Sequence, residues 1–481
     1  MNPRTELLPR EKLLRDTFTP AETFLFWLTL IVASIACWLA DPRSGWALGC
    51  FLIAAPLCPI VLKIHESTHP FFIELLWPRF WLILTPVLLL LLQFVIGLLQ
   101  SPLQTIEIEN ATYLSLTPVT LWQPTTTAGT LNWLTLGSFS ALYLVVANLF
   151  LIPKSRYFFE RMLKALCLGA TAVAIFGYLQ KALLLQQPLF TKGTGQTDFF
   201  AFFPYDGHWA AFALLWCSAC GAMTLLGLRG NGNQHFLKTK DRRYYIGTLL
   251  LGASGFLLQA RWPAAILLLV FAAILLKIAL VFWQESQDRH RKKIALLSTS
   301  IAGLALYAGM LRILDRSAEV AAARPLNQAA FQMFQDNPVF GWGADSFDDL
   351  LPFYISDTLS HLRFERAGSD FMQLCAEFGL FGIGLLVLTF SVLIRRYLRG
   401  RTNIKLTNQL LFGCAGLIVL AGFDSPCMSP AVFISFWLLF FTALRWADLT
   451  RNRADEVDAA PRPTFVTPAS KRNVPFYNNP S

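Results

Sequence analysis

The chain has 481 residues, of which 55% are hydrophobic and only 15% are charged, with a net charge of +10. Soluble globular proteins carry about 25% charged residues, so this composition excludes an ordinary soluble enzyme and a disordered chain. The positive charge would suit a nucleic-acid partner, but its distribution along the chain follows the pattern of membrane topology. We therefore expect an all-α polytopic membrane protein that lies in a lipid bilayer and binds no nucleic acid.

Twelve apolar segments are candidates for membrane spans, each of which needs about 20 mainly apolar residues. They are residues 22–40, 44–62, 79–99, 130–152, 161–185, 207–228, 245–260, 263–283, 294–311, 371–394, 407–423 and 430–446. This predicts a polar segment over 1–21, about nine spans over 22–311, a long loop over 312–370, about three spans over 371–446 and a disordered, Pro-rich tail over 447–481. The polar start predicts no cleavable signal peptide.

The basic residues alternate between the two sides of these spans. With the N-terminus inside, the cytoplasmic segments hold 31 Lys and Arg residues and the outer segments hold nine. Cytoplasmic loops of membrane proteins are enriched in Lys and Arg. The bias predicts that both termini lie in the cytoplasm and that the long loop lies on the outer side of the membrane.

The nine cysteines do not form the pattern of a disulfide framework. Most lie within or beside apolar segments, where cysteine usually packs as a small hydrophobic residue. Cys217 and Cys220 have a redox-like spacing but lie in the middle of a span without a second pair. Cys427 is expected to be a lone thiol on the outer side.

Two of the outer segments precede the long loop. Residues 100–129 are rich in Thr and Pro and predict short strands or coil that pack over the bundle. Residues 186–206 contain an aromatic run over 199–205, whose usual role at this depth is an interfacial belt. A contact between this run and a lipid or sugar is the functional alternative.

The long loop over 312–370 carries the most distinctive pattern. Residues 324–334 predict a helix with a proline near its start, which ends before the turn at residues 336–338. Pro338, Gly341 and Gly343 then flank Trp342, and the glycines permit a tight backbone path beside this indole. Asp370, Gln373 and Glu377 follow at the start of the tenth span, spaced to lie on one side of a helix.

Together these residues resemble the O-antigen ligase/O-antigen polymerase superfamily of membrane glycosyltransferases. The resemblance covers about residues 245–395: the turn from Asp336 to Gly343, the stretch from Asp370 to Gly382, and residues 259–262, where the family has a similar Arg-containing turn. It implies an inner-membrane protein with a GT-C-like helical fold, whose active face in the periplasm transfers a glycan from a polyprenyl (undecaprenyl) diphosphate carrier. The acceptor would be lipid A core, a growing saccharide or a protein. Transfer would invert the anomeric centre, with neither a metal nor a cofactor.

Arginines of the family bind the departing diphosphate, and the physical chemistry agrees, because guanidinium groups pair bidentately with phosphate oxygens. Arg261 lies at the outer end of two apolar segments, where an arginine is costly without a partner. Arg261 and Arg324 are therefore the first candidates for diphosphate ligands, and Arg312 and Arg316 are reserves. The alternatives are snorkelling to headgroups for Arg261 and a surface ion pair for Arg324.

On the acceptor side the chain departs from the family, because Gly368 stands where the family has a histidine. Three interpretations stay open. His361 substitutes for that histidine; Asp370 or Glu365 acts as general base; or the protein binds the carrier lipid without catalysis, as a subunit of a polysaccharide assembly system. A transporter of a lipid-linked or anionic solute is a further alternative, which predicts paired discontinuous helices.

Overall fold

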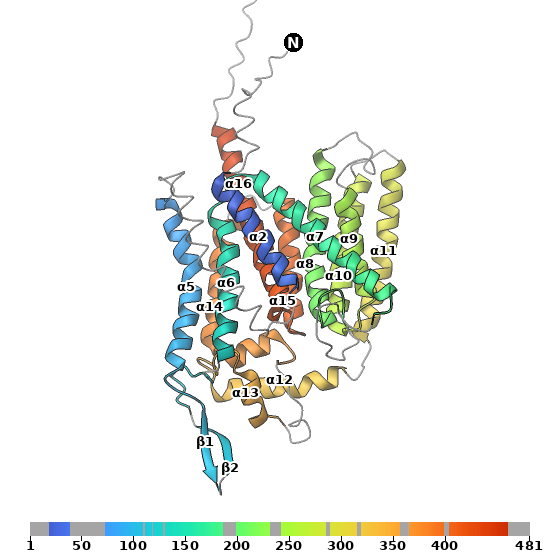
Figure 1. Cartoon of the computed structure of the whole chain (residues 1–481). Helices are drawn as coiled ribbons and strands as arrows, with labels where there is room; N and C mark the ends of the chain where they lie inside the picture. The colour runs from blue at the N-terminus through green and yellow to red at the C-terminus, as the bar shows by residue number, and fades with distance from the viewer. Residues whose placement is uncertain are drawn as a thin grey trace, which may run out of the picture.

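The computed structural model describes residues 19–38, 73–108, 111–117, 119–127, 130–185, 199–230, 242–284, 289–314, 319–355, 364, 366–398 and 404–459. Its fold is almost entirely helical (Figure 1). The elements are α2 (Pro20–Trp38), α5 (Ile73–Gly97), β1 (Leu103–Ile108), β2 (Ala111–Leu116), α6 (Thr130–Leu151), α7 (Arg156–Ala182), α8 (Asp206–Gly230), α9 (Arg242–Ala253), η3 (Ser254–Phe256), α10 (Arg261–Gln284), α11 (Arg289–Leu314), α12 (Glu319–Asp336), α13 (Phe347–Leu350), η4 (Leu351–Phe353), α14 (Asp370–Leu398), α15 (Lys405–Ala421), η5 (Pro426–Met428) and α16 (Pro430–Ala459).

Nine helices in the described part of the chain are long and apolar enough to cross a membrane. They are α2, α5, α6, α7, α8, α10, α11, α14 and α16, and each overlaps a predicted span. The predicted spans at 245–260 and 407–423 correspond to the shorter helices α9 and α15, and the one at 44–62 lies outside the described residues. The polytopic, all-α membrane fold is thus confirmed, while the count of twelve stays a prediction.

The helices form a bundle with two distinct ends (Figure 1). At one end, which we call the loop end, α12 and α13 lie across the helix ends, and the antiparallel hairpin of β1 and β2 projects beyond them. At the other, the tail end, α16 extends past the bundle. Helices α8, α10 and α16 form much of the apolar core, and α7 crosses the bundle obliquely.

The tail end also carries the basic starts of several helices. Helices α7, α9, α11 and α15 begin there with Arg156, Arg242, Arg289 and Lys405. These residues belong to the segments predicted to be cytoplasmic. Helix α16 continues through Ala459, thirteen residues beyond the predicted end of the last span at residue 446, because residues 447–459 are mostly good helix formers. The rest of the predicted disordered tail lies outside the described residues.

The tenth predicted span is a broken helix. At Gly379 the backbone of α14 takes φ 59° and ψ −161°, which is not helical. The amides of Leu380 and Phe381 donate instead to the carbonyls of Pro338 and Val339, at 2.8 and 2.9 Å. Backbone groups freed by a break inside a membrane protein must find such partners. The turn over 338–343 therefore supplies the acceptors for the amides that follow the break. The break divides α14 into a polar first half, Asp370–Phe378, which carries its buried amide and carboxyl side chains, and an apolar second half.

The aromatic run over 199–205 was expected at the membrane interface, or in contact with a lipid or sugar, and both expectations are wrong for its main residues. Phe199, Phe200 and Phe203 are buried inside the protein, with exposures of 1% or less. The backbones of Phe200 and Phe203 bond to each other across a turn, and the Phe200 ring stacks on Trp209 at 4.6 Å. The run folds back onto α8, so these rings pack in the core. In the segment over 100–129, strands and coil are confirmed for the described residues, of which Leu103, Leu116 and Val119 pack against apolar side chains at the loop end.

Candidate functional site

Polar side chains from five chain segments meet at the loop end, where several helices begin or end. We call this group the helix-end cluster. Its members are Tyr205, Asp206, His208, Arg261, Arg312, Arg366, Asp370, Asp424, Ser425 and Cys427. Ionisable side chains within or beside membrane spans are costly, and they mark functional sites by default. The cluster is therefore the first candidate site.

Asp206 at the start of α8 connects two parts of the cluster. Its carboxylate oxygen Oδ2 accepts hydrogen bonds from the backbone amides of Gln259 and Ala260, at 2.6 and 3.0 Å. These amides lie immediately before Arg261, in the predicted Arg-containing turn. Two amide donors stabilise the buried carboxylate. Asp206 thereby fixes the path of the turn and the place from which the Arg261 side chain starts.

The structure gives Arg261 a bonding role at the end of α11. Its Nε donates to the carbonyl of Arg312 at 2.7 Å, and its Nη2 donates to the carbonyl of Ile313 at 2.5 Å. The last carbonyls of a helix have no partner within the helix, and a cation there also interacts favourably with the helix dipole. Arg261 is only 8% exposed, so it does not snorkel to the surface. Arg312, the reserve candidate, donates to the Phe256 carbonyl at 3.4 Å.

His208, two residues into α8, lies against Arg366 and the turn between α15 and α16. Its Nε2 is 3.2 Å from the Ser425 carbonyl oxygen and 3.3 Å from Nη1 of Arg366. A carbonyl oxygen can only accept and an arginine N–H can only donate, so the ring tautomer decides which of these two Nε2 contacts is a hydrogen bond. Nδ1 is buried without a hydrogen-bond partner among the described residues.

Asp370 joins α14 to the same turn. Its amide donates to the Asp424 carbonyl at 3.1 Å, and its carboxylate accepts from the Cys427 amide at 2.6 Å. The Asp424 carboxylate accepts from the Tyr205 hydroxyl at 3.0 Å and from the Ser425 amide at 2.8 Å. Asp370, Asp424 and the Arg366 guanidinium are close enough to interact electrostatically. The predicted catalytic carboxylate Asp370 thus lies beside a cation, the guanidinium of Arg366.

Cys427 is a free thiol, as expected for a lone cysteine in this region. Burial raises the pKa of the Cys427 thiol well above its ordinary value, and the neighbouring Asp370 carboxylate raises it further. The reactive form of cysteine is the thiolate. Cys427 is therefore protonated at neutral pH and contributes its backbone amide, rather than a nucleophile, to the cluster.

The predicted loop motif forms a second group, which ties the loop to the break in α14. The amides of Trp342 and Gly343 donate to the carbonyls of Ala376 and Glu377, at 2.9 and 2.8 Å. Gly341 and Gly343 have φ values of 67° and 95°, so the tight path expected of these glycines is confirmed. The indole of Trp342 donates to the Met333 carbonyl at 2.7 Å, which anchors the turn to α12.

Gln373 and Glu377 also belong to this scaffold. The Gln373 amide donates to the Glu377 carboxylate at 3.0 Å, and both side chains are buried. The backbone of Asp345 also bonds to the Glu377 carboxylate, and the Thr135 hydroxyl donates to Asp345 at 3.1 Å. Glu377 therefore fixes the end of the loop turn against α14.

Several predicted site residues cannot be placed. His361, Glu365 and Arg316 lie outside the described residues, and of Arg324 only the helical backbone in α12 is described. Arg366 and His208 were not predicted. Asp206 and His208 stand at the start of an apolar span and are the sequence signal for this site. Polar residues at such a position are also typical of an ordinary helix end.

The cluster contains a histidine, three arginines and three aspartates at one end of an apolar bundle. This set can bind an anion and remove a proton from a hydroxyl group. No protein-family model and no curated protein matches the sequence of the chain.

Proposed function

We propose that the protein transfers a glycan from a polyprenyl diphosphate carrier to an acceptor, as a ligase or polymerase of surface polysaccharide. The observation that carries this proposal is the meeting of His208, Arg366 and Asp370 at the loop end. A polyprenyl chain would lie along the apolar bundle and place its diphosphate at such an end. The loop end would then face the periplasm of the inner membrane, as the distribution of basic residues predicts.

The proposed chemistry is a displacement at the anomeric carbon of the donor sugar. The oxygen of an acceptor hydroxyl forms a bond to that carbon, and the bond from the carbon to the diphosphate oxygen breaks, which inverts the centre. The leaving electron pair stays on the diphosphate, where the Arg366 guanidinium stabilises it. In the tautomer with its proton on Nε2, His208 takes the acceptor proton at Nδ1, the role for which the sequence offered His361, Glu365 and Asp370 as candidates.

In this proposal Asp370 is a positioning residue. Its carboxylate holds the Cys427 amide, and its own amide holds Asp424, so it fixes the turn whose Ser425 carbonyl orients the His208 ring. A hydrogen bond on one ring nitrogen determines which nitrogen is available to accept a proton. Arg261, Arg312 and Arg324 stay candidates for further contacts with the diphosphate.

The test is transfer by the purified full-length protein in lipid nanodiscs, supplied with a polyprenyl-diphosphate glycan and a panel of saccharide, lipid A core and protein acceptors. Release of polyprenyl diphosphate is measured for the wild type and for His208→Ala and Arg366→Ala. We expect losses of about 100-fold or more for each variant. Lys181→Ala is the matched control, because Lys181 is a cation at the same end that lies over Phe199, outside the cluster. Full turnover in both cluster variants would refute the proposal.

One observation favours a second candidate, a transporter of an anionic or lipid-linked solute. Discontinuous helices are typical of transporter binding sites, and α14 is broken at Gly379. In transporters the unwound backbone coordinates the cargo, whereas here the amides and carbonyls around the break bond to the loop turn. Uptake of the carrier-linked glycan into sealed vesicles without release of polyprenyl diphosphate would favour this candidate. Donor binding with neither uptake nor release would favour a non-catalytic carrier-binding subunit.

A further inference from the structure

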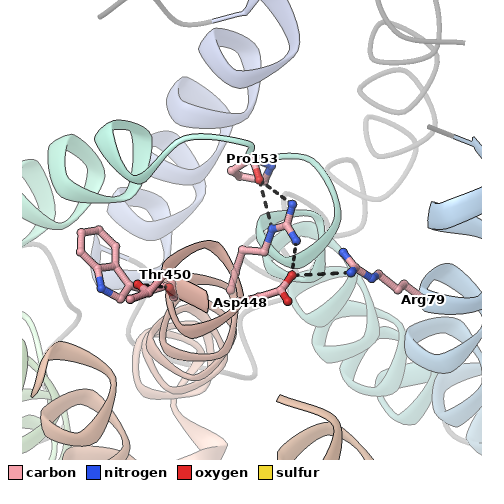
Figure 2. Close-up of polar contacts among 6 residues, drawn as sticks. Arg79, Pro153, Asp448 and Thr450 are labelled. Atoms are coloured by element: carbon pink, nitrogen blue, oxygen red, sulfur yellow. Dashed lines mark hydrogen bonds and ion pairs between the residues drawn. The ribbon is translucent and has the colours of Figure 1, made fainter. Parts of the chain in front are cut away.

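A second group of buried charges lies at the opposite end of the molecule, where α5, the turn between α6 and α7, and α16 meet (Figure 2). Asp448 on α16 is its centre. Arg445 pairs with the Asp448 carboxylate at 2.7 Å, and Arg79 from α5 approaches the same oxygen at 3.5 Å. We call Arg79, Lys154, Arg445 and Asp448 the tail-end cluster.

Arg445 and Asp448 have a full set of contacts within the protein. The Nε and Nη2 groups of Arg445 both donate to the Pro153 carbonyl, at 3.1 and 2.9 Å, while Nη1 binds Asp448. These contacts fix α16 to the turn between α6 and α7. Arg445 and Asp448 therefore form the rigid part of the cluster.

Arg79 is the incompletely bonded member. One of its nitrogens, Nη2, reaches Asp448, but Nε and Nη1 have no hydrogen-bond partner among the described residues. Its side chain is 12% exposed, compared with 5% for Arg445 and 6% for Asp448, so it is also the outermost of the three. Buried N–H groups of an arginine without an acceptor are costly, and a bound acceptor removes that cost.

The cluster also has an excess of positive charge. Three cationic side chains, those of Arg79, Lys154 and Arg445, accompany two carboxylates, Asp448 and Glu22. The Glu22 carboxylate also accepts a hydrogen bond from the backbone amide of Lys154, at 3.0 Å. Burial lowers the pKa of Lys154, Glu22 raises it, and Arg445 lowers it. An additional anion would balance the excess charge.

Trp81, two residues after Arg79 on α5, is 42% exposed, whereas the following turns of α5 expose aliphatic side chains such as Leu88 and Leu92. Tryptophan is enriched at the level of lipid headgroups, and aliphatic side chains face the acyl chains. Arg79 is thus expected at the depth where phosphate groups of lipids lie.

We propose that the tail-end cluster binds a phosphate-bearing anion at Arg79, whose unpartnered N–H groups donate to phosphate oxygens. Guanidinium N–H groups form charge-assisted hydrogen bonds with phosphate. A phospholipid headgroup and inorganic phosphate share this chemistry. The site lies at the end of the bundle opposite the helix-end cluster, and the proposal does not depend on glycan transfer.

The experiment measures thermal unfolding of the full-length protein in a sugar-headed detergent, which contains no phosphate. Phosphatidylglycerol, diacylglycerol, which has no phosphate, and inorganic phosphate are titrated separately at constant ionic strength. A ligand that binds only the folded protein raises the unfolding temperature as its concentration rises. We expect phosphatidylglycerol to stabilise the wild type more than diacylglycerol does, with half-saturation at an about tenfold higher concentration in Arg79→Gln.

Two further variants make the result specific. Lys164→Gln removes a cation that pairs with Glu160 on α7, outside the cluster, and is expected to titrate like the wild type. Arg79→Lys keeps the charge beside Asp448 but removes the guanidinium N–H donors; it is expected to bind less tightly and carries the test if Arg79→Gln does not fold. Stabilisation by phosphatidylglycerol alone identifies a lipid headgroup, and stabilisation by inorganic phosphate as well identifies the phosphate itself. Stabilisation that is absent, or unchanged in both Arg79 variants, overturns the proposal.

Discussion

The contact between the loop turn and the break in α14 leads to a quantitative prediction for Gly341→Ala. A Cβ atom on Gly341 would lie 2.5 Å from the carbonyl carbon of Glu377 and 2.6 Å from its oxygen, whereas ordinary contact begins at 3.4 Å. The turn would have to move by the difference, about 0.9 Å, because backbone atoms cannot rotate away as a side chain can. Such a shift would break the bonds from Trp342 and Gly343 to α14.

The expected cost combines two contributions. The loss of two backbone hydrogen bonds, now at 2.9 and 2.8 Å, costs about 1 kcal/mol each. Alanine at a φ of 67° costs about 1 kcal/mol more, because its Cβ crowds the carbonyl oxygen in the left-handed region. We therefore expect Gly341→Ala to lower the free energy of unfolding by about 3 kcal/mol.

The measurement is reversible unfolding in mixed detergent micelles. Gly384→Ala is the matched control, because this glycine lies in the same helix and a Cβ there would meet no atom within 4 Å. A second measurement is alkylation of Cys375, which is 7% exposed in the polar half of α14 and should become accessible when the turn separates. If Gly341→Ala unfolds within about 1 kcal/mol of Gly384→Ala and Cys375 stays protected, the described packing of the turn is incorrect.

Three further predictions concern both ends of the molecule. Because the pKa of Cys427 is raised, we expect maleimide to label it slowly at pH 7, with a rate that still increases above pH 9; a plateau near pH 8.5, the ordinary thiol range, would contradict the raised pKa. Arg445→Ala leaves a buried carboxylate poorly paired and should cost about 3 kcal/mol in unfolding free energy, whereas the apolar double variant Arg445→Met, Asp448→Leu should cost less; equal losses would refute this electrostatic explanation. Asn337→Ala removes the side-chain donor, 2.7 Å from the carbonyl oxygen of Gly341, that holds the turn closed, and should cost about 1 kcal/mol in the same unfolding assay; no change would show that the turn does not need this bond.

The sequence predicted the membrane-spanning helices well, because a span needs only a local run of apolar residues. It also predicted strands over 100–129 and the tight path at Gly341. It did not predict the break in α14, and the segment over 371–394 reads as one continuous apolar helix. The reason is physical: the break depends on Pro338 and Val339, which accept the amides after Gly379 from about 40 residues earlier in the chain. A local pattern contains no information about such a partner.

The helix-end cluster was only partly predictable for a related reason. Asp370 was predicted because it begins the motif that continues with Gln373 and Glu377, but its partners Asp424 and Cys427 belong to the turn that follows α15. The aromatic run was misinterpreted because hydropathy does not distinguish a ring that faces lipid from one that packs on Trp209. His208 was missed because one histidine hardly changes the mean hydropathy of an apolar span.

The break in α14 also explains how the first half of this helix contacts two different groups of residues, the helix-end cluster and the loop turn. Asp370 and Glu377 are seven residues apart, a spacing that predicts one shared face, yet they bond to different neighbours. Asp370 holds the turn between α15 and α16, whereas Glu377 holds Asp345 in the loop turn. The loop turn carries the backbone bonds at the break, so the polar half-helix ends there and need not continue into the apolar half. The half-helix therefore links the scaffold at its C-terminal end to the candidate site at its N-terminal end. A shift of the loop turn would reach Asp370 through a single rigid element, because the two carboxylates lie on the same two turns of helix.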